Sequence, residues 1–493
     1  MPRIANSIVR RAYAQDPLLP ALLGVCRDLS LAANELRWLR EHVDELPLAP
    51  APRPLNTSTR RKKRIPNNDK HRLRKIKEAK LRDLVKQRSR GTPLQYLLGT
   101  EFFGELELKC GRGVLVPRQD TASTIAHLAR LIRDPRNTLP NELRVLDLCT
   151  GTGCIPFLFG HELRETRHDI SYRMLGVDVS TDALTLATKN LRRFQRKPSS
   201  SNLFNTSTTE AKDDGEREDG HNAKGAKVLA NFMWADILNS PFEPQIENTP
   251  LPLMSAMNLA RHPPFWDIVI SNPPYISPDA YRKTTARSVR GFEPRLALVP
   301  PHPSTIPSSI STGVGSYTTS WPEKTIDTIT QDAGDTFYVP ILNIAAQVEA
   351  KVVLVEVADV EQAVRVARLG ENFGFEGVEI WRDRPDDTDE AFPSSPSSPY
   401  PKQHSQDSSP GITKKRETKE SKNDIPIVGA GNVRCVVFWR GNTGAAWLGK
   451  ETQNDSILRS ESHAMQPSMS RTDKFDGRYH ADALLLASKW KGL

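Results

Sequence analysis

The sequence predicts an α/β fold, in which helices cover an open and mostly parallel β-sheet, preceded by a small helical domain. Three observations lead to this prediction. Apolar strand-like runs alternate with helical segments from about residue 121 onward, as they do in parallel sheets. Residues 16–45 repeat apolar side chains every three or four positions, which is typical of helices. Polar intervals separate these segments and lower the hydrophobic content to 38% of the 493 residues.

The N-terminal part is expected to be helical and basic. Residues 1–16 carry three arginines and no acid before Asp16. This composition fits a mitochondrial presequence, and it equally fits the first helix of a basic domain. A helical domain is expected over 17–98, with helices at 16–45 and about 71–89 around a Pro-rich, basic insertion at 47–70. The basic run 60–64 could contact nucleic acid, but a solvated loop is favoured because no aromatic residues interleave with the charges.

A hairpin connector over 99–120 is expected to follow, because 102–118 alternate in polarity, with a turn near 110–113. The main domain then covers 121–450. Its strands are expected at 144–149, 173–179, 227–237, 267–271 and 351–357, and its helices at 121–133, from 154, and at 181–195, 336–349 and 360–370. Two last apolar runs, 377–383 and 434–440, are expected to pair antiparallel at the edge of the sheet.

Several intervals lack hydrophobic periodicity, so they are expected to be disordered insertions in surface loops. They are 197–226, 241–263, 300–332 and 384–430, with a polar C-terminal extension at 451–493. No apolar run approaches the roughly 18–20 residues that cross a bilayer, so no membrane partner is predicted. The five cysteines form no CxxC pair, which argues against a metal site and fits a reducing compartment. The net charge of +9 favours an anionic partner such as RNA or a ribosome-associated protein.

A glycine loop is the first candidate binding feature. In VLDLCTGTGC (145–154), a strand carrying Asp147 leads into a tight turn through Thr150, Gly151, Thr152 and Gly153. Glycines let the backbone bend sharply and let a ligand approach closely. The spacing is not GxGxxG, because Pro156 stands three residues after Gly153. The loop therefore favours a nucleoside without a phosphate contact over a phosphate cradle.

Two acids end the next two strands. Asp178 follows LGV, and Asp236 lies in WADI. An acid at the tip of the second strand of such a sheet typically accepts hydrogen bonds from ribose hydroxyls, whereas Asp236 is placed to reach an adenine edge. Asp178 could instead cap the helix that begins near Thr181. Because the carboxyl ends of parallel strands meet at one edge, all these loops are expected to converge there.

The run DIVISNPPY (267–275) ends a core strand with a polar amide and two prolines. Pro273 and Pro274 fix the backbone and donate no hydrogen bond, and Asn272 adds a side-chain carbonyl acceptor. Two fixed acceptors suit a planar NH2 group, on which Tyr275 could stack. Accepting both hydrogens returns electron density to the nitrogen and aims it at an electrophile. A purely structural proline turn is the alternative.

The motifs SNPPYI, DLCTGTG and GVDVS resemble those of S-adenosylmethionine-dependent amino-methyltransferases with a seven-strand Rossmann-like sheet. More narrowly, GTPLQYLLGTEFFGELELKCGRGVLVPRQDT, FEPRLAL and VLVEVADVEQAVRV resemble the release factor glutamine methyltransferases of the HemK type. The resemblance covers most of 17–45, 71–196, 227–240, 264–299, 333–383 and 431–440. It implies methylation of the glutamine side-chain nitrogen in the Gly-Gly-Gln motif of a class 1 peptide chain release factor, with S-adenosyl-L-methionine as cofactor and no metal.

The resemblance also implies roles for particular residues. The cofactor would be held by Asp147, Cys149, Thr150, Gly151, Thr152, Gly153, Asp178, Asp236, Ile237 and Asn272. The substrate amide would be held by Asn272, Pro273, Pro274 and Tyr275, with Asn272, Pro273 and Tyr275 as the catalytic set. Two positions depart from the family pattern. Cys149 replaces the first loop glycine, which would strain the backbone if that position has a positive φ. Ala122 replaces a usual glutamate.

The basic N-terminus favours a mitochondrial release factor and a place in the mitochondrial matrix, near the ribosome, with the cytoplasm as the alternative. Two other functions stay open. The same motif would accept the exocyclic amine of a flipped adenine, so an N6-adenine methyltransferase acting on DNA or RNA is one alternative. The other is a non-catalytic ribosome-associated or RNA-binding protein that retains a methyltransferase shell. The helical N-terminal domain would serve substrate recognition.

Overall fold

The computed structural model describes residues 4–47, 67–196, 228–239, 247–301, 332–387 and 425–450. The basic run 60–64, the C-terminal extension 451–493 and most of the expected insertions lie outside these ranges, so their predicted disorder stays a prediction. Within the described residues, no helix is both long and apolar enough to span a bilayer.

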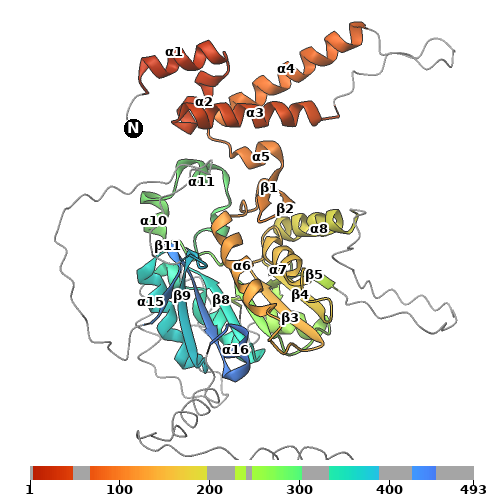
Figure 1. Cartoon of the computed structure of the whole chain (residues 1–493), viewed down its shortest axis with the longest axis vertical. Helices are drawn as coiled ribbons and strands as arrows, with labels where there is room; N and C mark the ends of the chain where they lie inside the picture. The colour runs from red at the N-terminus through yellow and green to blue at the C-terminus, as the bar shows by residue number, and fades with distance from the viewer. Residues whose placement is uncertain are drawn as a thin grey trace, which may run out of the picture. The chain divides into compact units, whose positions relative to one another are not determined.

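Five helices form the described N-terminal part (Figure 1), of which α2, α3 and α4 fall in the stretches that the periodicity predicts, whereas α1 and α5 were not predicted from it. They are α1 (Asn6–Gln15), α2 (Leu19–Cys26), α3 (Leu29–Glu45), α4 (Asn67–Ser89) and α5 (Leu94–Leu98). Asp28 caps α3, because its carboxylate accepts a hydrogen bond from the Leu31 amide at 2.7 Å. Their shared core contains Leu22, Ala32, Leu36, Leu39 and Val43 from the predicted apolar stripe. Helix α4 begins at Asn67, so the predicted insertion 47–70 extends a few residues too far.

A buried ion pair fastens α3 to α4. Arg88 donates to both oxygens of Glu35, at 2.7 and 2.8 Å. Glu35 is only 2% exposed. A buried carboxylate requires such a partner.

The expected hairpin is present, but its predicted turn is wrong. Strands β1 (Thr100–Phe103) and β2 (Leu106–Lys109) pair with Phe103 opposite Leu106. The turn is therefore Gly104-Glu105 and not 110–113. Gly104 has a φ of +57°, which tight two-residue hairpin turns require at their first position. Gly113 also has a positive φ, but it lies in the loop that follows β2.

The main sheet is mostly parallel, as predicted. Its order is β10-β9-β11-β8-β7-β3-β4-β5-β6, and only β11 runs antiparallel to its neighbours. The strands are β3 (Glu142–Leu148), β4 (Ser171–Asp178), β5 (Val228–Asp236), β6 (Leu251–Pro252), β7 (Ile268–Ser271), β8 (Val352–Glu356), β9 (Gly377–Arg384), β10 (Ile427–Val428) and β11 (Ala430–Trp439). Two of the nine strands, β6 and β10, are two-residue additions at the edges. The other seven form the expected seven-strand sheet, with β9 and β11 as the predicted antiparallel pair.

Helices cover both faces of the sheet. Successive strand residues point to opposite sides, and the apolar side chains on both sides are buried under helices. Val145 packs with α6 (Gln119–Ile132), α7 (Cys154–Arg164) and α8 (Thr181–Arg196) on one face. Its neighbour Leu146 packs with α9 (Leu253–Leu259), α14 (Tyr338–Gln347) and α15 (Val360–Leu369) on the other. Short helices α10 (Pro278–Lys283), α11 (Arg287–Phe292) and α16 (Gly441–Trp447) and the 3-10 turns η1 (Arg295–Ala297), η3 (Ala333–Asp335) and η4 (Gly370–Phe373) complete the described chain.

The prediction of a disordered insertion at 241–263 is wrong for its described part. Residues 251–259 form β6 and α9, in which Leu253, Ala256 and Met257 are buried. These three side chains follow helical spacing and pack on the sheet. Their signal spans barely one helical turn, and the prolines and polar residues around it concealed it. The expected insertion 384–430 is likewise too wide, since β10 and β11 begin within it.

Candidate active site

A cavity of about 300 Å³ lies at the carboxyl ends of the parallel strands. The loops after β3, β4, β5 and β7 supply residues that line this cavity, as the fold class predicts. Nine of the predicted site residues border this cavity: Cys149, Thr150, Gly151, Thr152, Asp178, Asp236, Ile237, Asn272 and Pro274. The other four, Asp147, Gly153, Pro273 and Tyr275, are not among its lining residues.

The glycine loop makes the tight turn that its sequence predicts. Gly151 and Gly153 have φ values of +56° and +77°. A Cβ on Gly151 would meet no atom within 4 Å, whereas a Cβ on Gly153 would lie 2.7 Å from the Phe157 ring. The absence of a side chain at Gly151 therefore leaves space for a ligand next to the backbone, and its absence at Gly153 allows the loop to pack against α7.

Cys149 also has a positive φ, of 65°. Replacement of the family's glycine by cysteine therefore stores strain, of about 1–2 kcal/mol for a residue with a Cβ. Burial raises the pKa of its thiol well above the usual value, so the side chain is uncharged. Its side chain packs partly against the core, which offsets some of the strain.

Asp178 connects the glycine loop to the start of α8. One carboxylate oxygen accepts a hydrogen bond from the Gly151 amide at 2.9 Å, and the other accepts one from the Ser180 amide at 2.8 Å. Burial raises the pKa of Asp178, and these amides partly counteract the rise. The carboxylate has lone pairs left for a ligand on the cavity side. The turn-stabilising role and the proposed ribose role are thus compatible.

Asp236 and Asp147 have different surroundings. Asp236 accepts a hydrogen bond from the Leu238 amide at 2.8 Å, and burial raises its pKa. Asp147 is 0% exposed, and no described residue makes a well-aligned hydrogen bond to its carboxylate oxygens, although the Thr150 hydroxyl faces them and partly lowers the pKa. Burial raises the pKa of Asp147 to about 8. Asp147 therefore lies beneath the glycine loop as a neutral acid at neutral pH.

The Asn272–Tyr275 segment follows β7 directly. Asn272 donates from its side-chain nitrogen to the Thr121 hydroxyl, at 3.4 Å. None of the described residues donates a hydrogen bond to the carbonyl of Pro273 or Pro274. The Tyr275 carbonyl accepts one from Gln362 at 3.3 Å. Tyr275 packs against the core and is not among the residues that line the cavity, and burial raises the pKa of its hydroxyl to about 12.

Sequence reasoning missed the wall formed by 113–118. This segment lines the cavity opposite the strand tips, and it is held from two sides. The buried carboxylate of Glu293 accepts hydrogen bonds from the Val116 amide at 3.0 Å and the Arg118 guanidinium at 2.8 Å. The Tyr96 hydroxyl donates to the Val114 carbonyl at 2.7 Å. The motifs VPRQDT and FEPRLAL were visible in the sequence, but nothing in them showed that they would pair. Phe337, at the start of α14, lines the cavity without any sequence signal.

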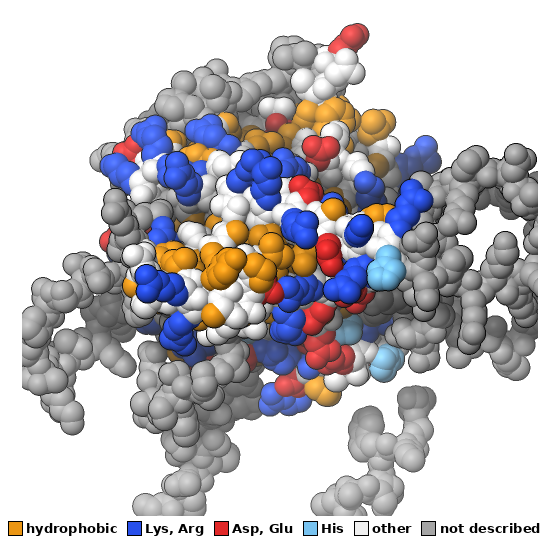
Figure 2. All heavy atoms as spheres, turned by 90° about the horizontal axis from the view of Figure 1, so that it is seen from above, with side chains coloured by type: hydrophobic (Ala, Val, Ile, Leu, Met, Phe, Trp, Pro, Cys, Tyr) orange, Lys and Arg blue, Asp and Glu red, His pale blue; other side chains and the backbone are white. Residues whose placement is uncertain are grey.

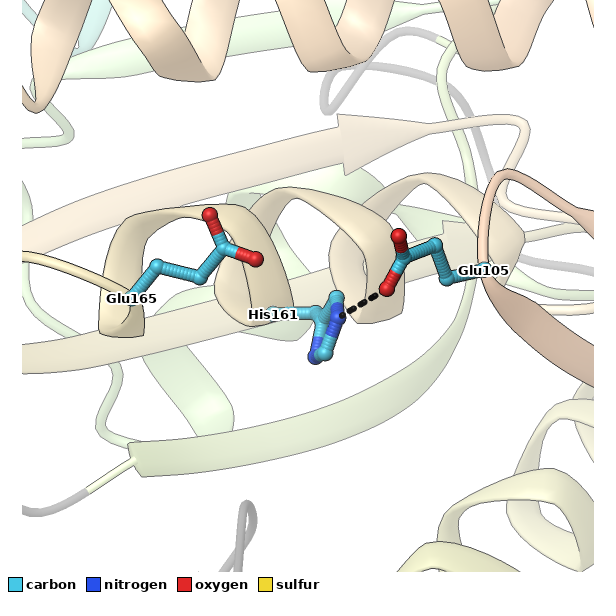
Figure 3. A group of neighbouring side chains, drawn as sticks. All are labelled: Glu105, His161 and Glu165. Atoms are coloured by element: carbon cyan, nitrogen blue, oxygen red, sulfur yellow. Dashed lines mark ion pairs between the residues drawn. The ribbon is translucent and has the colours of Figure 1, made fainter.

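One group of possible metal-binding side chains lies away from the cavity. Glu105, His161 and Glu165 have ligand atoms within 4.8 Å of one another (Figure 3). The His161 ring nitrogen lies 3.8 Å from the Glu105 carboxylate, and both glutamates are exposed. Such a group is common on protein surfaces, and it gives no reason to assign a metal.

The chain is similar in sequence to several known proteins. No family model matches the chain. A Schizosaccharomyces pombe protein named probable MRF1 mitochondrial N(5)-glutamine methyltransferase mtq1 is 29% identical over 299 residues, covering 61% of this chain and 73% of that protein. The Saccharomyces cerevisiae mitochondrial MRF1 N(5)-glutamine methyltransferase MTQ1 is 28% identical, covering 61% and 68%. A release factor glutamine methyltransferase of Chlorobaculum tepidum is 28% identical, covering 45% and 57%.

Solved structures are more distant. The N-terminal domain of human METTL16 is 13% identical and covers 73% of this chain and 82% of that one, with a TM-score of 0.33. A likeness at this level carries no argument about the site.

The residues on the cavity wall fit S-adenosylmethionine as a ligand. Gly151 leaves room for a close approach, Asp178 and Asp236 offer acceptors, and Cys149, Ile237 and Phe337 add apolar surface. With its seven-strand sheet, this cavity and these relatives, the chain is a class I S-adenosylmethionine-dependent methyltransferase. Its resemblance to the release factor glutamine methyltransferases, first seen in the motifs, is confirmed by sequence similarity over 61% of its length.

Proposed function

We propose that this protein methylates the side-chain amide nitrogen of the glutamine in the Gly-Gly-Gln motif of a class 1 peptide chain release factor. One observation carries the proposal. Asn272 and Pro274 border the same cavity as Gly151 and Asp178, so the acceptor segment and the cofactor loop face one space. The names of the relatives from two yeasts and several bacteria support the same substrate.

The cofactor would be held by the glycine loop, Asp178 and Asp236, and when bound it supplies an electrophilic methyl group on a sulfonium. Asn272 Oδ1 would accept one hydrogen of the substrate amide, and the Pro273 carbonyl, to which no described residue donates, would accept the other by turning toward the cavity. An amide nitrogen is a poor nucleophile because its lone pair is delocalised. Fixed acceptors that bind both hydrogens return electron density to the amide nitrogen. They also hold this nitrogen in line with the methyl group. Tyr275 would stack on the substrate amide only if its ring turns toward the cavity, since it is not among the lining residues.

The proposed partner is a release factor of mitochondria, encountered close to the ribosome in the matrix. The two yeast relatives are named as mitochondrial enzymes, and the N-terminal residues are basic. Figure 2 shows Lys and Arg side chains spread over the face seen from above, around an area of hydrophobic side chains. Such a surface suits a partner that is bound to RNA. A tagged protein that fractionates with the cytosol would contradict this location.

The substrate is tested with labelled S-adenosylmethionine and three acceptors. These are a purified mitochondrial release factor, the same factor with Gln→Ala in its Gly-Gly-Gln loop, and single-stranded DNA or RNA. Labelling of the intact factor alone is the expected result. Label that persists in the Gln→Ala variant would refute the glutamine assignment. Label that appears only on nucleic acid would instead support the N6-adenine alternative, and no label on any acceptor would favour the non-catalytic one.

A further inference from the structure

A buried carboxyl group lies behind the acceptor segment. Glu356 is the last residue of β8, and it is 1% exposed. Strands β7 and β8 are parallel neighbours in which Ser271 pairs with Val355. The next residues along each strand, Asn272 and Glu356, therefore leave the sheet side by side at its carboxyl edge. One oxygen of Glu356, Oε1, has no hydrogen-bond partner among the described residues.

Thr121 connects the two side chains. Its hydroxyl accepts a hydrogen bond from Asn272 Nδ2 at 3.4 Å, and it also faces the Glu356 carboxyl group, whose pKa it lowers. A hydroxyl carries a single hydrogen. Because Thr121 accepts from Asn272, its own hydrogen is available to the Glu356 carboxylate. Thr121 is 2% exposed and borders the cavity, so it lies between Glu356 and the site where a substrate would bind.

We propose that Glu356 is a positioning residue for methyl transfer, whose carboxylate acts through Thr121 to keep the Asn272 carbonyl oxygen directed at the cavity. An ionised carboxylate can only accept, so the direction of each hydrogen bond in the chain is fixed. Asn272 Nδ2 must face Thr121, and Oδ1 remains for the substrate NH2 group. The inference rests on the proposed function for its substrate, although any acceptor that presents an NH2 group needs the same orientation.

Protonation of Glu356 would allow the opposite orientation. A protonated carboxyl can donate to Thr121, whose hydroxyl can then donate to a flipped Asn272 amide. The cavity would then face the Asn272 NH2 group, which repels the NH2 group of a substrate. Burial raises the pKa of Glu356 to about 7. The switch therefore falls in the pH range of enzyme assays.

Several ionisable groups face Glu356 and affect its protonation. Arg434 on β11 and Arg118 before α6 lower its pKa, and Asp120 on α6 raises it. Arg434 is itself engaged by Asp120, which accepts a hydrogen bond at 2.7 Å. The remaining groups are neutral at pH 7, because burial raises the pKa of each: Tyr275, Tyr338, Cys154 and Cys435.

The first test needs no substrate. The side-chain NH2 resonances of Asn272 are assigned in asparagine-labelled, cofactor-bound protein by their loss in Asn272→Asp, and they are followed by NMR from pH 5.5 to 8.5. We expect them to titrate near pH 7. This titration should be lost in Glu356→Gln and in Thr121→Val, and it should return in Thr121→Ser. Resonances that do not move with pH in the wild type, or that still titrate in Glu356→Gln, would overturn the inference.

The second test is kinetic. In the wild type, kcat should fall as the pH is lowered through about 7, whereas Glu356→Gln should have a lower and pH-independent kcat. The expected loss at pH 8 is roughly 10- to 100-fold, of the order seen for a lost oriented contact to the reacting group. Cofactor affinity should be unchanged, and the exposed Glu361→Gln on α15 is the matched control. A Glu356→Gln variant with wild-type kcat and pH profile would refute the inference. An inactive wild type with a titrating Asn272 would refute the substrate and leave the inference standing.

Discussion

Replacement of Gly153 by alanine should destabilise the protein more than the same replacement at Gly151. Both glycines have a positive φ, of +77° and +56°. Alanine therefore adds about 1–2 kcal/mol of backbone strain at either site. It also restricts the unfolded chain at either site, which returns about 0.4–1 kcal/mol. These two effects nearly cancel when the variants are compared with each other.

The space around the two positions differs. At Gly153 the new Cβ would lie 2.7 Å from Phe157 and 2.9 Å from Phe232, whereas at Gly151 it would meet nothing within 4 Å. Overpacking of this kind costs about 1–3 kcal/mol. The difference in unfolding free energy between Gly153→Ala and Gly151→Ala should therefore be about 1–3 kcal/mol.

Urea unfolding followed by circular dichroism measures this difference. With a slope of about 2 kcal/mol per M, the midpoint of Gly153→Ala should be lower than that of Gly151→Ala by about 0.5–1.5 M. Cofactor affinity should be reduced more in Gly151→Ala than in Gly153→Ala, because the methyl group at residue 151 would project into the cavity. Equal midpoints, or a less stable Gly151→Ala, would refute the assignment of Gly153 to packing and Gly151 to ligand approach.

Three further predictions concern the acids and the acceptor segment. Asn272→Ala should nearly abolish turnover and leave cofactor affinity largely intact, as measured by single-turnover kinetics and calorimetry; a large loss of cofactor binding would mean that Asn272 mainly supports the cofactor. Asp178→Ala should weaken S-adenosylmethionine binding by about 10- to 100-fold, since hydrogen bonds to a charged group are worth about 1.5–3 kcal/mol. The control variant Asp279→Ala, on exposed α10, should bind the cofactor as the wild type does. Equal affinities of the two variants would contradict the ribose role of Asp178. Asp147 has a folded-state pKa of about 8, above its ordinary value of 3.8, so its contribution to stability is full below pH 3.8 and is lost as the pH rises toward 8. The unfolding free energy of the cofactor-free protein should thus fall over this range more steeply in the wild type than in Asp147→Asn, and parallel curves would show that Asp147 is not buried as a neutral acid.

Local sequence signals predict most of the residues that border the cavity. The positions after β3, β4, β5 and β7 were predictable because parallel strands end at a common edge, and nine of the thirteen predicted site residues border the cavity. The displaced hairpin turn and the missed helix α9 have a common cause. Each depends on a few residues, Gly104 in one case and three apolar side chains in the other, and longer polar or Gly-containing stretches nearby outweighed them.

The sequence by itself determined the order along the chain of the seven main strands and the helices that cover them, the carboxyl-edge position of the motifs and the chemical groups that they offer. These follow from hydrophobic periodicity and from the residue types in short contiguous runs. Only the tertiary structure decided which side chains meet across the chain. Glu293 accepts a hydrogen bond from Val116, Thr121 faces Glu356, and Tyr275 packs against the core. Contacts between residues more than a hundred positions apart depend on how the layers pack, and no local pattern encodes that packing.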